Sequence, residues 1–396
     1  MASKVPTKQT KRRKPSLWER FKASRYSKLV PILLFALVGT YFIAFGAALP
    51  GSDPGIQEPD NLARGLVYNG KKEATKGPCK GTIDVEPASA ADIEICAHPD
   101  PGPEGVDVRE RDKHVDADLA AQVGNDAKNQ PLAADSTAIA PDIQPTGAAD
   151  TGSSGSLSVV TPVNWPCVGT GTDGYRVQMI YAYASGYSNR VSYVRPGFET
   201  IARRVNAVFH NSGVASGGVR NVRYVTSSTC VLSLPAVPIT GNISDVVNIT
   251  NQLKARGYGA ASRKYLTLVD GGSPCGWGTF STDPQPGQAN YNNIGPNYAT
   301  VWHPCWNYEE AHELMHTLGA VLTGAPYSTG AAHCYDQHDV MCYKDTSGKT
   351  MIQRCTSSTY IWRFDCGYDT YFRAAGATGW LYSHWNTANS RFLSHT

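Results

Sequence analysis

Residues 161–396 alternate between short apolar runs and segments in which apolar residues recur every three or four positions. The apolar runs predict strands, and the helical spacing predicts helices. The predicted strands are residues 175–184, 221–226, 264–270 and 298–302, and the predicted helices are residues 198–213, 243–257 and 307–321. Strands and helices in this order are typical of an open sheet covered by helices. We therefore predict an α+β domain with a twisted sheet over residues 161–396.

A long apolar segment precedes this domain. Residues 29–49 contain no charged residue, and a helix of that length can span a hydrocarbon core of about 30 Å. Residues 1–28 carry ten Lys or Arg and one acid, which predicts a basic cytoplasmic tail and an exported remainder. Cleavable signals have shorter apolar cores of about 7–15 residues, so we predict a transmembrane signal anchor at 29–49. The small residues that end the segment also allow cleavage and secretion.

An acidic segment rich in Pro, Ala and Gly separates the apolar segment from the domain. Residues 50–150 carry nineteen acids and nine bases. Few aromatic residues and a strong net charge leave little to bury, so residues 50–160 are predicted to be a largely disordered stalk. A small module closed by Cys79 and Cys96 is compatible with this reading. The sequence leaves open whether the stalk serves as a prodomain.

All ten cysteines lie beyond the apolar segment, and an even number in an exported region favours disulfides over thiols. Neighbours in sequence suggest the pairs Cys79–Cys96, Cys167–Cys230, Cys275–Cys305, Cys334–Cys342 and Cys355–Cys366. Other pairings remain open, because the eight cysteines after residue 160 allow about 105 of them. The domain also lacks a basic stripe with interleaved aromatics, so we expect no nucleic-acid partner.

The segment "HELMH" carries the clearest chemistry in the chain. His312 and His316 are four residues apart, so a helix places them on one face, one turn apart. Zinc binds imidazole nitrogen, and a catalytic zinc site needs three protein ligands and a water. Glu313 follows the first histidine and is placed to act as a general base on that water. Asn307 is the expected helix cap.

These residues resemble the metzincin clan of zinc metalloproteases. The resemblance rests on "HELMHTLG" at 312–319 and "VMCY" at 340–343. It implies a turn at Gly319, a methionine turn at Met341 beneath the metal, and a Tyr343 that stabilises the tetrahedral intermediate. Exported actinobacterial proteins with this helix and a "DVMCY" segment are also similar to this chain.

The third zinc ligand is the point at which the chain departs from the clan. Leu322 stands where one large protease family has that ligand, and an alkyl side chain cannot bind zinc. We favour His333, because neutral imidazole suits zinc and a flexible segment precedes it. The alternatives in the same loop are Asp336, His338 and Asp339.

The sequence therefore predicts a zinc-dependent endopeptidase with protein or peptide substrates. It would act outside the cytoplasmic membrane, either anchored through residues 29–49 or secreted. Two alternatives stay open: an inactive metalloprotease-like surface protein, which Leu322 supports, and a zinc hydrolase of a non-peptide amide such as a cell-wall bond. Neither the cleavage preference nor the oligomeric state can be read from the sequence.

Overall fold

A computed structural model gives the fold of the chain. It describes residues 56–57, 71–86, 95–100, 160–272, 275–306, 309–343, 345, 349–355 and 362–396. All of them belong to the unit Asp53–Thr396. The predicted tail at 1–28 and the predicted anchor at 29–49 lie outside the described residues. Among the residues that are described, no helix is both long enough and apolar enough to cross a bilayer.

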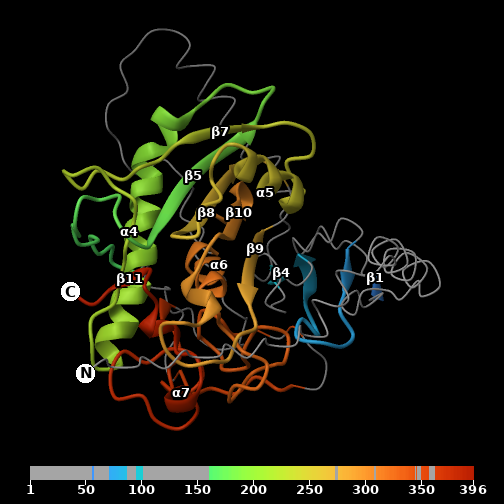
Figure 1. The fold of residues 1–396 in the computed structure, drawn as a ribbon, viewed down its shortest axis with the longest axis vertical. Coiled ribbons are helices and arrows are strands. Elements are labelled where there is room, and N and C mark those ends of the chain that lie inside the picture. Colours follow the sequence, from blue (N-terminus) through green and yellow to red (C-terminus); the bar gives the residue numbers. More distant parts are fainter. Residues whose placement is uncertain are drawn as a thin grey trace, which may run out of the picture. The chain divides into compact units, whose positions relative to one another are not determined.

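A mixed nine-stranded sheet forms the centre of the fold (Figure 1). Its strands, in chain order, are β1 (Ile56–Gln57), β2 (Lys72–Glu73), β3 (Ile83–Glu86), β4 (Ile95–Asp100), β5 (Arg176–Ala184), β7 (Ala236–Ile239), β8 (Arg263–Asp270), β9 (Gly276–Ser281) and β10 (Asn297–Trp302). The spatial order is β1-β2-β3-β4-β9-β10-β8-β5-β7. Strands β7, β5, β8 and β10 are parallel, and β9 runs antiparallel to β10. A two-stranded sheet joins β6 (Asn221–Val222) to β11 (Leu393–Ser394).

Helices cover both faces of the large sheet. Within the described ranges, the helices are α4 (Val191–Ala215), α5 (Val246–Ala255), α6 (Glu310–Thr317) and α7 (Trp380–Ser383), with short 3₁₀ turns at Tyr291–Asn293, His303–Cys305 and Thr387–Asn389. Helices α4 and α6 pack in the larger core with Val177, Met179 and Tyr181 of β5. Helix α5 packs against the opposite face with Ile180 and Ala182. Alternate β5 residues therefore enter two different cores, as the period of a strand requires.

Three of the predicted strands are confirmed as β5, β8 and β10. The strand predicted at 221–226 is shorter, because only Asn221–Val222 forms β6. The apolar pattern of the sequence does not predict β7 or β9. In β9 the glycines at 276 and 278 remove the side chains that would mark a strand.

All three predicted helices have different bounds in the structure: α4 begins earlier, at Val191, and α5 and α6 are shorter than predicted. Helix α4 continues through Gly213 to Ala215, although Gly usually ends a helix. A Cβ at Gly213 would lie 2.7 Å from the Arg220 backbone nitrogen, so this glycine permits a close packing contact. Helix α6 begins at Glu310 with Glu309 at its N-cap position, so the prediction that Asn307 caps it is wrong; Asn307 itself lies outside the described residues.

All five disulfides suggested by sequence neighbours are present. Four of them join residues after position 160, and the fifth, Cys79–Cys96, lies wholly within residues 71–100.

Residues 71–100 lie in the part of the chain predicted to be a stalk with a possible small module closed by Cys79 and Cys96, and that disulfide is present. The antiparallel strands β2, β3 and β4 continue the large sheet, and β4 pairs with β9 from Ile95↔Ser281 to Asp100↔Gly276. The strong net charge of residues 50–150 does not reveal these strands, because strand pairing uses backbone groups and needs few apolar side chains.

The core position of α4 gives a first testable prediction. Phe209 is fully buried, and its ring centroid lies 4.8 Å from that of Phe364. We expect Phe209→Ala to lower the free energy of unfolding by about 3–5 kcal/mol, because the truncation leaves a cavity. Val214→Ala on the same helix is the control, since Val214 is 56% exposed, and it should change stability by less than about 0.5 kcal/mol. Denaturant midpoints of the disulfide-intact variants measure both effects, and equal midpoints would contradict the prediction.

Candidate metal centre

Helix α6 places two imidazoles at one point. It packs against β9 and β10, with Leu314 and Met315 fully buried in the main core. His312 and His316 lie one turn apart, and their Nε2 atoms are 3.0 Å from each other. Both side chains are buried, so the helix directs them into the protein interior.

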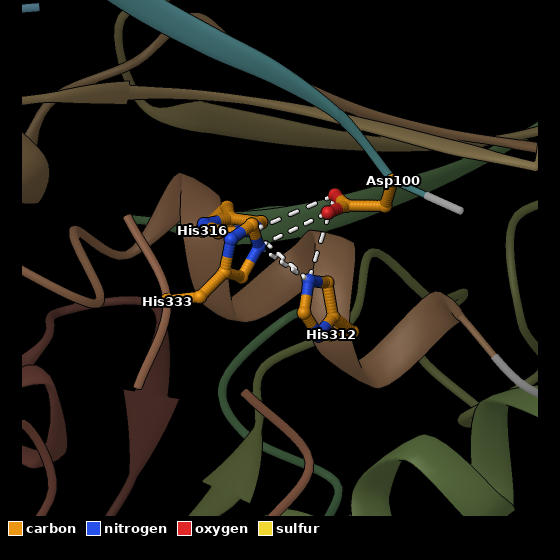
Figure 2. Close-up of side chains that lie close together, drawn as sticks. All are labelled: Asp100, His312, His316 and His333. Carbon is orange, nitrogen blue, oxygen red and sulfur yellow. Dashed lines mark hydrogen bonds and ion pairs between the residues drawn. The ribbon is translucent and has the colours of Figure 1, made fainter. Parts of the chain in front are cut away.

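A third imidazole, that of His333, arrives from the segment after the helix. The chain leaves α6 at Gly319, whose φ of +94° is a conformation that favours glycine. A Cβ there would also lie 2.4 Å from the side chain of Asn292. The Nε2 atom of His333 lies 3.3 Å from that of His312 and 3.1 Å from that of His316 (Figure 2).

The other ring nitrogen of each histidine has an acceptor of its own. His312 Nδ1 lies 2.7 Å from the Val340 carbonyl oxygen, and His316 Nδ1 lies 2.9 Å from that of Ala320. His333 Nδ1 lies 2.7 Å from Asp345 Oδ2. These contacts favour the tautomer in which Nδ1 donates a proton and Nε2 keeps a lone pair.

The donor set fits a metal ion. Tetrahedral ligand atoms about 2.1 Å from a zinc ion lie roughly 3.4 Å apart, close to the separations of the three Nε2 atoms. If all three Nδ1 atoms carry protons, the buried Nε2 lone pairs face one another without a donor between them. A cation at their centre satisfies all three, so this buried group could hold a metal ion.

A carboxylate that no sequence motif indicates also belongs to the cluster. Asp100, the last residue of β4, is fully buried. Its Oδ1 lies 3.0 Å from His333 Nε2, and its Oδ2 lies 3.5 Å from His312 Nε2 and 3.6 Å from His316 Nε2 (Figure 2). No spacing rule links Asp100 to a helix more than 200 residues later, so only the β4–β9 pairing reveals its position.

Charge within the cluster alters the titration of its members. Burial alone would raise the pKa of Asp100, but the positive charges of His312 and His333 hold it well below its usual range. Burial would lower the pKa of His333, but the charge of Asp100, aided by Asp345, raises it to about 9. Burial, with the neighbouring histidines, lowers the pKa of His316 to about 3. Asp100 therefore acts as the counter-charge of the cluster.

Glu313 lies beside the imidazoles and is fully buried. Within the described part of the chain, neither of its carboxylate oxygens has a hydrogen-bond partner. Close contact with β9 accounts for the burial: a Cβ at Gly276 would lie 1.8 Å from Glu313 Oε1, and one at Gly278 would lie 2.6 Å from His316 Cβ. Burial, followed by the charge of Asp100, raises the pKa of Glu313 well above its usual range.

Tyr343 also belongs to the cluster. Its ring centroid lies 4.2 Å from that of His333, and its hydroxyl donates a hydrogen bond to Asp100 Oδ1. Burial, followed by the charge of Asp100, raises the pKa of this phenol. The hydroxyl therefore remains a donor at ordinary pH.

The structure brings His312, Glu313, His316, His333 and Tyr343 together but places the competing candidates elsewhere. Asp336 accepts hydrogen bonds from the backbone N–H groups of Arg354 and Cys355, and Asp339 accepts from Tyr371 and Met341. Among the described residues, His338 belongs to no potential metal group. Leu322 and Met341 are buried in the main core.

Asp336 and Asp339 form a second group with Cys355 and Cys366. Those two cysteines are joined in a disulfide, so their sulfur atoms are not available as thiolate ligands. This group therefore lacks the donors of a metal site.

Comparisons with known proteins add little. No family model matches the chain, and no curated protein matches it. Among solved structures, the chain is similar to metalloproteinase-II from Bacteroides fragilis, with 14% identity and a TM-score of 0.26 over 72% of this chain and 75% of that one. A likeness with this TM-score supports no conclusion about fold or function, so the function must be argued from the site itself.

Metal content tests the cluster directly. We expect His333→Ala to weaken zinc binding by more than about 100-fold, since the loss of a direct ligand exceeds the 10–100-fold cost of losing a group that only orients one. His338→Ala, in the same loop, is the matched control and should keep stoichiometric zinc. Competition with a chelator, followed by metal analysis of the desalted protein, measures both. Equal zinc retention by the two variants would contradict this assignment.

A pH-dependent stability follows from Asp339. Burial raises its pKa to about 8, whereas an unfolded aspartate titrates near pH 4. Between these values the folded protein retains a proton that the unfolded chain has lost, so stability falls as the pH rises through this window. Asn mimics the protonated form and removes this dependence.

Relative to Asp339→Asn, the wild type should therefore lose up to about 1.4 kcal/mol per pH unit between pH 4 and 8. Denaturant unfolding of both proteins at several pH values gives the difference in free energy. A difference that stays constant across the window would show that Asp339 titrates normally in the folded protein.

Proposed function

We propose that this chain is a zinc-dependent endopeptidase that acts on protein or peptide substrates outside the cytoplasmic membrane. The observation that carries the proposal is the buried carboxylate of Glu313 beside three converging imidazole nitrogens, with no hydrogen-bond partner among the described residues. A purely structural metal site has no need of such a carboxylate. A hydrolytic site needs a general base in that place.

The residues of the cluster then take distinct roles. Zinc held by His312, His316 and His333 would supply Lewis-acid chemistry, which polarises the scissile carbonyl and acidifies a water molecule. Glu313 accepts the proton of that water as its oxygen attacks and passes the proton to the leaving amine. Glu313 must be ionised to accept that proton; burial and the charge of Asp100 oppose ionisation, whereas the positive charge of a bound metal ion would favour it. Tyr343 would donate a hydrogen bond to the oxyanion.

The proposal includes a metzincin-like arrangement of the domain. Helix α6, the turn at Gly319 and the segment that contains Met341 and Tyr343 follow the order that the sequence resemblance implies. Leu322 does not weaken the proposal, because it packs in the core while His333 offers the third imidazole.

A peptide is favoured over a non-peptide amide by the strand beside the site. Strand β9 passes over α6 and accepts an extended chain segment, β4, along its length. Addition of an extended strand to a sheet is a general mode of peptide recognition. The five disulfides suit an oxidising compartment, so the proposal retains export, with the chain either anchored through residues 29–49 or secreted.

Substitution of the proposed base tests the function. We expect Glu313→Gln to keep zinc and to reduce casein hydrolysis by about 10²–10⁴-fold, because the amide cannot accept the proton. Both Glu313→Gln and its parent should carry Asp100→Ala. The Asp100 carboxylate lies 3.0–3.6 Å from the three Nε2 atoms, and its removal leaves the fourth side of the cluster open to water and substrate. Glu199→Gln, on α4 and partly exposed, is the matched control.

Removal of the metal provides the second arm of this test. A chelator should abolish hydrolysis, and added zinc should restore it. Hydrolysis that persists in Glu313→Gln, or that is insensitive to the chelator, would refute the proposal.

A further inference from the structure

Two reactive side chains that the proposed mechanism does not use lie together inside the protein. Lys264 belongs to β8 and Asn297 begins β10, and the two residues are direct partners in the parallel pairing of these strands. Lys264 is fully buried, and Asn297 is 3% exposed. The Lys264 Nζ atom donates a hydrogen bond to Asn297 Oδ1 at 2.8 Å. A primary amine therefore contacts a carboxamide in a place from which water is excluded.

The surroundings of this amine are apolar. Leu266 and Leu268, two and four positions further along β8, enter the larger core, so the side chain of Lys264 lies on the same face of the sheet. Its Nζ atom lies 4.8 Å from the ring centroid of Phe392, which is fully buried. Burial lowers the pKa of Lys264 well below its usual range. It thereby favours the neutral amine, whose lone pair can act as a nucleophile.

The separation of the two groups is close to that of a reacting pair. The carbon of the Asn297 carboxamide is bonded to Oδ1 at about 1.23 Å, so it lies at most about 4.0 Å from Lys264 Nζ. Reacting atoms approach to about 3–3.5 Å, which a rotation of the amide can provide. The pairing of β8 with β10 holds both backbones in place. Folding has therefore already met the entropic cost of bringing the two groups together.

We propose that Lys264 and Asn297 form a self-modification site, at which the amine and the carboxamide condense to an isopeptide bond between β8 and β10. The lone pair of Nζ adds to the carboxamide carbon Cγ, and the Nζ–Cγ bond forms. The Cγ–Nδ2 bond breaks, and Nδ2 takes up the proton that Nζ gives up and leaves as ammonia. The step needs neither an oxidant nor a cofactor, and it does not depend on the proposed function of the metal centre.

Burial determines both the rate of this step and the lifetime of its product. Hydrolysis of the new bond needs water at the carboxamide carbon, and the burial of Lys264 and Asn297 keeps water away. Among the described residues, no carboxyl group forms a hydrogen bond or an ion pair with Lys264. Without such a group to transfer protons, we expect the bond to form slowly after folding and then to persist.

The isopeptide bond fixes the first residue of β10, the strand that precedes helix α6. The disulfide Cys275–Cys305 joins the residue before β9 to the turn that follows β10, so it holds the opposite end of that strand. The new bond links residues 33 positions apart. Closure of this loop lowers the entropy of the unfolded chain and thereby favours the folded state. Unlike the disulfide, the isopeptide bond survives reducing agents.

Peptide mapping of the full chain by mass spectrometry tests the modification directly. Chymotrypsin cuts after tyrosine, so an unlinked and reduced chain releases residues 259–265 and residues 292–298 as separate peptides. The isopeptide bond joins them into one branched peptide, whose mass is lower than the sum of the two by one ammonia. A succinimide at an asparagine also loses ammonia, but it leaves the two peptides separate. The branched peptide should accumulate while the folded protein is incubated, and it should not form in protein kept in denaturant.

Substitutions identify the two reacting groups. Lys264→Met removes the nucleophile and Asn297→Ala removes the carboxamide, so neither variant should give the branched peptide. Lys254→Met, on α5, is the matched control and should give as much of it as the wild type. Recovery of the two peptides only in separate form from folded wild-type protein after prolonged incubation would overturn the proposal, whether or not the variants fold. A branched peptide of unchanged yield in Lys264→Met would overturn it as well, because another amine would then be the nucleophile.

Discussion

The arrangement of the site depends on three hydrogen bonds that fix the imidazole rings. Each Nδ1 atom has an oxygen acceptor on the segment that follows α6, namely the Ala320 and Val340 carbonyls and the Asp345 carboxylate. These acceptors turn the rings so that the three Nε2 atoms converge at 3.0–3.3 Å. Buried lone pairs so close together repel one another unless a cation or protons lie between them. The path of the chain from Gly319 to Asp345 is therefore tied to the chemistry of the cluster.

Close contact between sheet and helix is the second constraint. The glycines of β9 allow the strand to lie directly on α6, where any Cβ would collide with Glu313 or His316. The contact removes water from Glu313. The free-energy cost of ionising a carboxyl without water raises its pKa. A buried carboxyl with a strongly raised pKa and no hydrogen bond among the described residues is typical of functional sites. Stability and proposed function thus oppose each other at this residue.

The sequence by itself determined the local features of this protein. It located β5, β8 and β10 and the helical pair His312 and His316, and it suggested the five disulfide pairs that the structure has. Each depends on residues at most 63 positions apart, which a periodic pattern or a rule that pairs neighbouring cysteines can capture. It also favoured His333 over Asp336, His338 and Asp339, but only on ligand preference, since every one of them could reach the helix.

Only the tertiary structure decided the rest. It brought His333 to the other two imidazoles and assigned Asp336 and Asp339 to backbone and tyrosine contacts. It also placed Asp100 in the cluster through the β4–β9 register, a pairing between residues 176 or more positions apart. Such contacts depend on which strand of the sheet has an unpaired edge. They also depend on which charged groups can be buried together at an acceptable desolvation cost. Both are properties of the folded molecule, and no local pattern in the chain records them.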